Sequence, residues 1–161
     1  MDSPSKDATV YFYAQVDPYS EFSNFAPYGI EVDGVWWRTT EHYFQAQKFN
    51  DAAYRERIRA CDRAKDAKAL GMTRNPPLRP DWEEVKDGVM LCAVRLKFGT
   101  HAGLRKLLLS TGDAQIVENA PWDPYWGCGT DGTGLNKLGK ILMMVRKELR
   151  QAEVGCAMRC R

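Results

Sequence analysis

Two long stripes of apolar residues at helical spacing constrain the fold of this chain more than any other feature. In the first stripe, apolar side chains recur mostly at spacings of three or four residues, at Trp82, Val85, Val89, Cys92, Ala93 and Leu96. The second stripe, near the C-terminus, comprises Leu135, Leu138, Leu142, Val145 and Leu149. Because three to four residues make one helical turn, each set lies on one face of a helix. Both faces are assigned to a packed core, without a chemical role.

Local signals predict where the helices begin and end. Asp81 and Glu84 have the spacing of a capping box, so the first long helix is expected to begin near Trp82. Thr39 or Thr40 offers an N-cap for a helix that extends to about Phe49. Shorter helices are expected over residues 52–60, 63–70 (ended by Gly71) and 104–109.

The predicted strands lie in the N-terminal part of the chain. β-Branched and aromatic residues favour a strand over 9–13, and Asp33-Gly34 predicts a tight hairpin between residues 30–32 and 35–37. A chain of 161 residues has the usual length of one domain. The predicted fold class is therefore α+β, a mostly α-helical single domain with a small N-terminal β-hairpin and sheet.

Charge and composition exclude several classes of protein. The formal net charge of +2 is too small for binding to nucleic acid by bulk charge, so any such contact must be local. No apolar run is long enough to cross a membrane, and residues 1–7 lack the apolar core of a secretory signal. Five cysteines, an odd number, favour reduced thiols. These features predict a cytoplasmic protein, with the nucleus as the alternative, and no membrane partner.

One predicted helix carries an unusual polar face. Glu41, Gln45 and Lys48 follow one another at positions i, i+4 and i+7, so the three side chains project from one face. A solvated ion pair on a surface helix would produce the same pattern. Aromatic neighbours such as Phe44 and Phe49 favour the alternative, in which the polar face is buried and carries chemistry.

A metal site is not predicted. The chain has two histidines, His42 and His101, and neither has the second ligand that a metalloprotease helix carries at i+4. Cys156 and Cys160 are four residues apart but have no matching pair elsewhere. No other cofactor is indicated.

A glycine-rich loop precedes the last helix. Gly127, Gly129 and Gly132 formally match the dinucleotide-binding fingerprint, but the strand that should precede it is missing. The loop is instead expected to offer backbone N–H groups to a phosphate at the helix N-terminus. Its neighbours Trp122, Tyr125 and Trp126 are able to stack a base. A surface turn anchored by a core tryptophan is the alternative.

These segments, in this order, resemble the NADAR domain family of N-glycosidases. The resemblance rests on Phe22–Phe25, Thr40–Phe49, Asp81–Lys86, Tyr125–Gly127 and Gly134–Gly139, and it extends from about Tyr11 to Arg150. It implies a flexible N-terminus over residues 1–8, an N-glycosidase domain over 9–150 and a C-terminal tail over 151–161.

The resemblance implies cleavage of the C–N bond between a ribose and a base. The most favoured substrate is ADP-ribosyl-guanine in DNA. The alternatives are phosphorylated intermediates of riboflavin biosynthesis and a module that binds ADP-ribose without cleaving it. The expected catalytic residues are Glu41, Lys48 and Asp123. The expected substrate-binding residues are Ser23, Asn24, His42, Gln45, Trp82, Tyr125, Trp126, Gly127, Gly129 and Asn136.

The chemistry of a ribosyl C–N bond agrees with these roles. Its cleavage passes through an oxocarbenium-like state, which a carboxylate such as Glu41 stabilises. Lys48 has two possible roles: it protonates the leaving base, or, if desolvated, it attacks C1 and forms an imine. The expected partner is thus a small molecule with an ADP-ribose or ribosyl-phosphate moiety, or ADP-ribosylated DNA. The residues do not indicate an oligomeric state.

Overall fold

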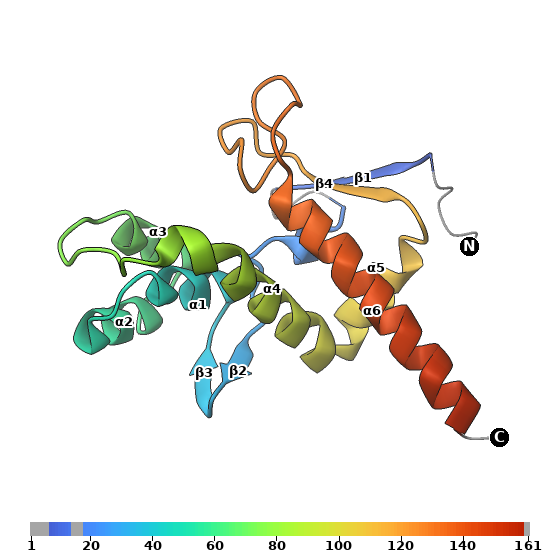
Figure 1. Ribbon diagram of the computed structural model, residues 1–161, viewed down its shortest axis with the longest axis horizontal. Helices are drawn as coiled ribbons and strands as arrows, with labels where there is room; N and C mark the ends of the chain where they lie inside the picture. Colours follow the sequence, from blue (N-terminus) through green and yellow to red (C-terminus); the bar gives the residue numbers. More distant parts are fainter. Residues whose placement is uncertain (1–6, 14–17, 160–161) are drawn as a thin grey trace. The chain divides into compact units, whose positions relative to one another are not determined.

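The computed structural model describes residues 7–13 and 18–159, except for the side chains of 156–159. Most of the predicted flexible N-terminus and the side chains of Cys156 and Cys160 therefore lie outside the described residues. The chain divides into two compact units (Figure 1). Asn24–Lys97 form one, here called the central unit, and the segments on either side of it form the other, called the terminal unit. Each unit is described by itself.

The central unit begins with a hairpin of two antiparallel strands, β2 (Ile30–Val32) and β3 (Val35–Trp37). Asp33 and Gly34 between them have φ angles of 50° and 77°, the left-handed backbone that a tight hairpin turn requires. The hairpin predicted from the sequence is confirmed, with the same residues in both strands.

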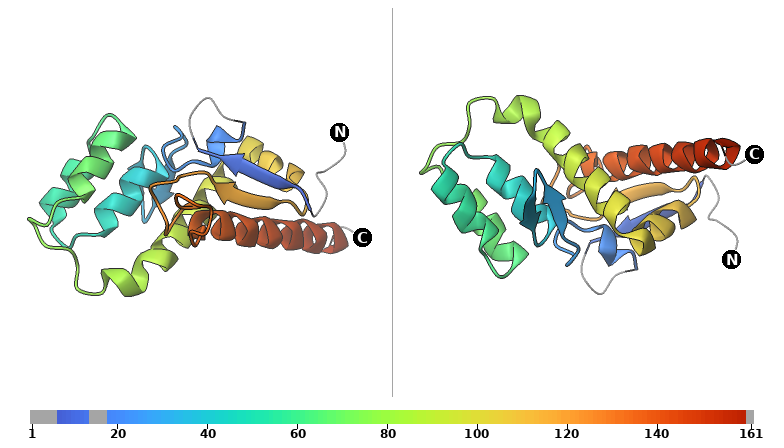
Figure 2. Two further views of the ribbon diagram at one scale, coloured as in Figure 1. Left: turned by 90° about the horizontal axis from the view of Figure 1, so that it is seen from above. Right: turned by 90° about the horizontal axis from the view of Figure 1, so that it is seen from below.

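Three short helices follow the hairpin: α1 (Thr40–Gln47), α2 (Ala52–Arg59) and α3 (Ala64–Gly71). The first helix packs against both others, as Figure 2 shows. Seven of the eight residues of α1 are buried, including charged and polar ones. The surrounding core consists of Ile30, Trp37, Tyr43, Ala46, Phe49, Ile58, Ala67 and Ala93. The alternative of a solvated surface helix is therefore wrong.

Helix α4 (Trp82–Thr100) begins at the predicted residue. Its apolar stripe packs in the central unit, where Trp82 and Ala93 are buried. The Asp81 carboxylate accepts two hydrogen bonds from the guanidinium group of Arg79, at 2.6 and 2.9 Å. The residues of α4 beyond Lys97 belong to the terminal unit.

The terminal unit contains a second sheet of two parallel strands, β1 (Thr9–Phe12) and β4 (Gln115–Glu118). A short 3₁₀ helix, η1 (Ser20–Phe22), follows β1, and helices α5 (Ala102–Ser110) and α6 (Lys137–Arg159) complete the unit. Strand β4 was not predicted, because all strands were placed near the N-terminus. Four residues are too few to show a period, and the pairing with β1 is set by contacts remote in sequence.

The prediction that Leu135 lies on the face of the last helix is wrong. The helix begins at Lys137, so Leu135 lies in the preceding loop, where it is 47% exposed. Asn136 separates the two with a φ of 49°, and this left-handed residue breaks the helical phase. Leu138, Leu142 and Val145 are buried as predicted. The helix also continues through most of residues 151–161, the predicted tail.

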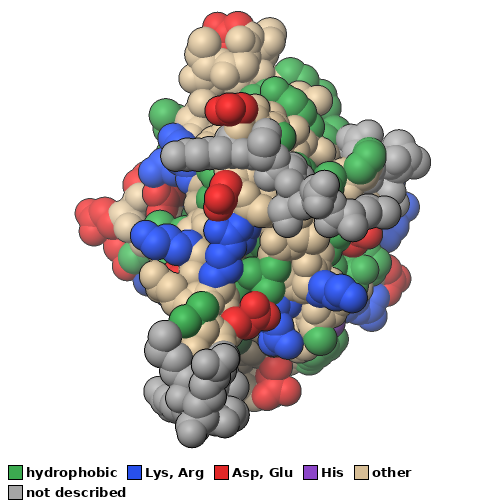
Figure 3. All heavy atoms as spheres, turned by 90° about the vertical axis from the view of Figure 1, so that its right-hand side faces the viewer, with side chains coloured by type: hydrophobic (Ala, Val, Ile, Leu, Met, Phe, Trp, Pro, Cys, Tyr) green, Lys and Arg blue, Asp and Glu red, His purple; other side chains and the backbone are tan. Residues whose placement is uncertain are grey.

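The predicted fold class, α+β and mostly helical, is confirmed by these elements. Among the described residues, no helix combines the length and the apolar character that a membrane crossing needs. On the face shown in Figure 3, basic and acidic side chains alternate across the described surface. This mixture agrees with the small net charge of +2.

Candidate active site

The first turn of α1 places Glu41 in a buried position. Thr39 caps the helix: its hydroxyl oxygen accepts a hydrogen bond from the backbone N–H of His42. Asn24 holds the same turn from outside, since its backbone carbonyl accepts from the Glu41 N–H at 3.1 Å and its side-chain oxygen accepts from the Thr40 hydroxyl at 3.0 Å. The Glu41 residue is 5% exposed. A carboxylate at this end of a helix is favoured by the helix dipole.

Gln45 lies one turn further along α1 and contacts Glu41 directly. Its amide nitrogen Nε2 donates a hydrogen bond of 2.7 Å to Oε1 of Glu41, and Gln45 is 4% exposed. A hydrogen bond to an ionised acceptor inside a protein is short and strong. Gln45 therefore fixes the orientation of the buried carboxylate.

Lys48 ends the same helix, and its amine is largely removed from water. Nζ donates a hydrogen bond of 3.2 Å to the backbone carbonyl of Gly71, and it lies 5.9 Å from the centre of the Phe44 ring. Burial lowers the pKa of Lys48 below its ordinary value; the negative charge of Glu41 opposes this shift, while Arg74 and Lys68 add to it. A desolvated amine with a lowered pKa is the form that can act as a nucleophile.

Trp82 extends this cluster with an aromatic contact. Its ring packs against Phe44 with the ring centres 5.1 Å apart and the planes at 60°. Phe44 thus lies close to both the Trp82 ring and the Lys48 amine. The central unit brings together five of the predicted site residues in this way: Asn24, Glu41, Gln45, Lys48 and, through Phe44, Trp82.

Both ring nitrogens of His42 lie within hydrogen-bond distance of protein groups. Its Nδ1 lies 2.8 Å from the Thr39 hydroxyl and its Nε2 lies 3.0 Å from the backbone carbonyl of Cys61. Burial lowers the pKa of His42; the hydrogen bond to the Cys61 carbonyl opposes this shift and Arg38 adds to it. Both ring nitrogens are engaged, so His42 ties α1 to the loop between α2 and α3.

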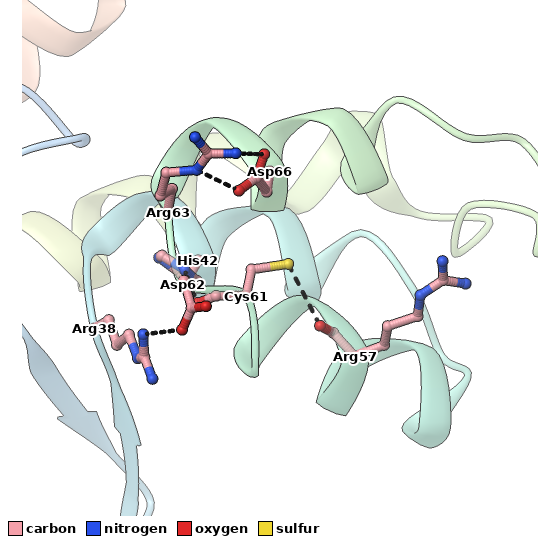
Figure 4. A network of polar contacts seen from close by, with 7 residues as sticks. All are labelled: Arg38, His42, Arg57, Cys61, Asp62, Arg63 and Asp66. Atoms are coloured by element: carbon pink, nitrogen blue, oxygen red, sulfur yellow. Dashed lines mark hydrogen bonds and ion pairs between the residues drawn. The ribbon is translucent and has the colours of Figure 1, made fainter.

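Figure 4 shows the polar contacts at that loop. Asp62 accepts from Arg38 at 2.9 Å, and Asp66 pairs with Arg63 at 2.8 Å. The cysteine of the loop carries a free thiol, like Cys92 and Cys128. Within the described part of the chain, no three His, Cys, Asp or Glu side chains are grouped as a metal ion would need.

The remaining predicted site residues lie in the terminal unit. One carboxylate oxygen of Asp123 accepts from the backbone N–H groups of Tyr125 and Trp126, at 3.0 and 2.8 Å. Asn136 uses both ends of its side-chain amide, accepting from the N–H of Glu118 and donating to the carbonyl of Ile116. Asp123 and Asn136 thus shape the glycine-rich loop and attach it to β4.

Several backbone N–H groups of this loop donate hydrogen bonds to nearby protein groups. Gly127, Gly129 and Gly134 donate to carbonyls of the same segment, and Lys137 and Leu138 at the start of α6 donate to the loop carbonyls of Tyr125 and Trp126. The N–H groups named here are therefore occupied, and the expectation that the loop binds a phosphate stays a prediction. Two of the glycines are required by the backbone conformation and packing of the loop. Gly129 has a left-handed φ of 71°, and the Cβ of a side chain at Gly127 would lie 2.8 Å from the Cβ of Ala120.

The aromatic side chains beside this loop range from half-buried to exposed. Tyr125 and Trp126 pack edge to face, with ring centres 4.9 Å apart, and Trp122 is 62% exposed beside Tyr13. Ser23 is buried at the end of η1, where its N–H donates to the carbonyl of Ser20. These rings have the flat surfaces that a base or a sugar could contact.

The sequence did not indicate Gly71 as a site residue. Its only visible signal was a glycine at the end of a predicted helix, which is common in proteins. In the structure it is the last residue of α3 and touches both Gln45 and Lys48.

Comparisons with known proteins show which family the chain belongs to. The model of the NADAR domain matches residues 11–150. An N-glycosidase of Nostoc punctiforme is 50% identical over 145 residues, which cover 88% of this chain and 93% of that protein. N-glycosidase YbiA of Escherichia coli is 50% identical over 144 residues, covering 89% and 90%. The NMR structure of the E. coli protein YbiA has a TM-score of 0.88 and 47% identity, and the match covers 96% of this chain and 92% of that chain.

A larger relative contains the same region. A riboflavin biosynthesis protein of Vibrio vulnificus is 40% identical over 142 residues, which span 88% of this chain and 39% of that protein. The prediction of a hydrolase that acts on N-glycosyl bonds is confirmed at the level of the enzyme class by the relatives of matching length. With a family model that spans most of its length, the chain belongs to the NADAR domain family.

Proposed function

We propose that Glu41 and Lys48 cleave the C–N bond of a phosphorylated ribosylamine. The observation that carries this proposal is the pairing, on one buried helix, of a carboxylate fixed by Gln45 with an amine whose pKa is lowered by burial. A module that only binds its ligand has no need of either group. The non-catalytic alternative is therefore less favoured.

In the proposed reaction, Lys48 attacks C1 of the ribose as a neutral amine. The C–N bond breaks and its electron pair stays on the nitrogen of the base, which takes up the proton released from the attacking amine. Glu41 stabilises the positive charge that develops at C1. The sugar ring then opens to an imine on Lys48, and water hydrolyses this imine to release the ribose phosphate and restore the amine. In the alternative role, Lys48 stays charged and protonates the base.

For the substrate, we propose a ribosylamino-pyrimidine phosphate of the riboflavin-biosynthesis type. The support is the name of the Vibrio vulnificus relative, whose matching region covers 88% of this chain. ADP-ribosyl-guanine in DNA, the substrate favoured from the sequence alone, becomes the second candidate. It shares the ribosyl C–N bond, so the same two residues would serve.

The resemblance also gives proposals for the terminal unit. We retain Tyr125 and Trp126 as substrate-binding residues, on the support of their half-buried rings, which pack edge to face. For Asp123, Asn136, Gly127 and Gly129, the contacts support a role in shaping the loop. His42 is proposed to position α1, because its two nitrogens bond to protein groups.

One experiment separates the candidates. The protein is incubated with the ribosylamino-pyrimidine phosphate and, separately, with DNA that carries ADP-ribosyl-guanine, and the released sugar is identified by mass spectrometry. Release of ribose phosphate from the first supports the leading proposal; release of ADP-ribose only from the second supports the other. If the protein binds ADP-ribose but releases no sugar from either substrate, the result supports the alternative of a module that binds ADP-ribose without cleaving it.

A further inference from the structure

The amide of Gln45 is bonded at one end only. Its nitrogen donates to Glu41, while its oxygen Oε1 is buried and has no hydrogen-bond partner among the described residues. An unpartnered buried carbonyl is costly to a folded protein. Turning the amide over would bring two oxygens together at Glu41, so the bond to the carboxylate fixes this orientation.

Gly71 is the residue that makes room for this oxygen. A side chain there would place its Cβ 1.9 Å from Oε1 of Gln45 and 2.7 Å from Cδ, far inside van der Waals contact. The backbone carbonyl of the same glycine accepts the hydrogen bond from Nζ of Lys48. One residue at the end of α3 therefore contacts both Gln45, which holds the Glu41 carboxylate, and the Lys48 amine.

The chemistry of Gln45 fits a positioning role. A lysine at this place would form an ion pair with Glu41 and compensate the charge that the reaction needs. A glutamate would repel Glu41 and share a proton with it. A glutamine donates one strong hydrogen bond and leaves the negative charge uncompensated.

We propose that Gly71 is a positioning residue for Glu41 and Lys48: its missing side chain seats the Gln45 amide against the carboxylate, and its carbonyl holds the amine. This inference rests on the proposed function, because it assumes that Glu41 and Lys48 act on the substrate. Neither Gly71 nor Gln45 needs to touch the substrate.

The test compares two glycine substitutions in the full-length protein. Gly71→Ala forces the Gln45 amide away from its place, so we expect kcat to fall by about tenfold or more while KM changes by less than about threefold. Gly88→Ala is the matched control, since a Cβ at Gly88 in α4 meets no atom within 4 Å. It should keep full activity and an equal or higher melting temperature.

A double substitution separates positioning from damage to the fold. Gln45→Ala removes the two atoms that would clash most with a side chain at position 71. If Gly71 acts through Gln45, the double variant has about the same kcat as Gln45→Ala alone, because the two effects do not add. Effects that multiply, or a kcat of Gly71→Ala equal to that of Gly88→Ala, would overturn the inference.

Glu41→Gln distinguishes failure of this inference from failure of the proposed function. If Glu41→Gln is inactive and Gly71→Ala is fully active, the positioning role alone is refuted. If Glu41→Gln itself turns over normally, the proposed function of the Glu41 and Lys48 pair is refuted as well.

Discussion

Glu41→Gln is the most direct test of the buried carboxylate. Glutamine has the shape of glutamate and can still accept the hydrogen bond of 2.7 Å from Gln45, so the helix should keep its structure. What the substitution removes is a negative charge in a site that is 5% exposed. We therefore expect a loss of turnover with little change in melting temperature.

The magnitude follows from the charge that the reaction develops. A carboxylate about 4 Å from a unit positive charge stabilises it by about 4 kcal/mol when the effective dielectric constant is about 20. A loss of about 1.4 kcal/mol corresponds to a tenfold lower rate, so removal of the whole interaction lowers kcat by up to about a thousandfold. Because the glutamine dipole retains part of the interaction, we expect a decrease of about a hundredfold or more.

The assay measures initial rates of sugar release as a function of substrate and pH. The matched control is Glu84→Gln on the exposed face of α4, which should have normal kinetics. Ligand-induced thermal shifts should show that Glu41→Gln still binds the substrate. A kcat close to that of the unmodified protein would refute the role assigned to Glu41.

The pH profile of the same variant reports on Lys48. The charge of Glu41 raises the pKa of Lys48, so its removal must lower that pKa further. If the neutral amine attacks C1, the rising limb of the kcat/KM profile moves to lower pH. If the ammonium donates a proton instead, the falling limb moves to lower pH.

Three further predictions concern Lys48 and the glycine-rich loop. Borohydride added during turnover should trap a covalent sugar adduct on Lys48, visible by mass spectrometry and absent in Lys48→Ala; no adduct combined with an active Lys48→Arg would favour the charged role. Burial lowers the pKa of Lys48 below its ordinary value of 10.5, so the charged amine lowers the free energy of unfolding at every pH below the lowered pKa. This loss shrinks as the pH rises above the lowered pKa and is gone once the pH exceeds 10.5. Lys48→Met should therefore gain stability in urea unfolding at neutral pH, with a gain that shrinks as the pH is raised; a constant difference would contradict the linkage. Gly129→Val should lower the stability by about 1–2 kcal/mol, because its φ of 71° is left-handed, and an unchanged melting temperature would show that the loop tolerates it.

Local signals were sufficient for the parts of the fold that short segments determine. The left-handed turn at Asp33 and Gly34 and the cap at Thr39 depend on neighbouring residues, so both could be predicted from the sequence. The shared face of Glu41, Gln45 and Lys48 follows from helical spacing, and one contact along it, the hydrogen bond from Gln45 to Glu41, is now visible. The burial of that face could be argued only from the aromatic residues around it.

Long-range contacts determined what the sequence could not reveal. Strand β4 forms because it pairs with β1, and no pattern within its four residues predicts a parallel partner. The close approach of Gly71 to Gln45 likewise joins two helices at a point that no local pattern marks. In the loop before α6, the sequence showed the glycines but not that their N–H groups bond to nearby carbonyls.

The way in which Asn136 attaches to β4 has a consequence for self-association. A two-stranded sheet has open edges, and an open edge is a template on which another chain can add a strand. On the side of β4 that faces away from β1, the Asn136 amide donates a hydrogen bond to the carbonyl of Ile116 and accepts one from the N–H of Glu118. The carbonyl of Glu118 accepts a hydrogen bond from the N–H of Cys128. The Asn136 side chain thus makes the hydrogen bonds that a neighbouring strand would make. Replacing Asn136 by alanine would leave these backbone groups of β4 free to pair with another chain, and aggregation would increase.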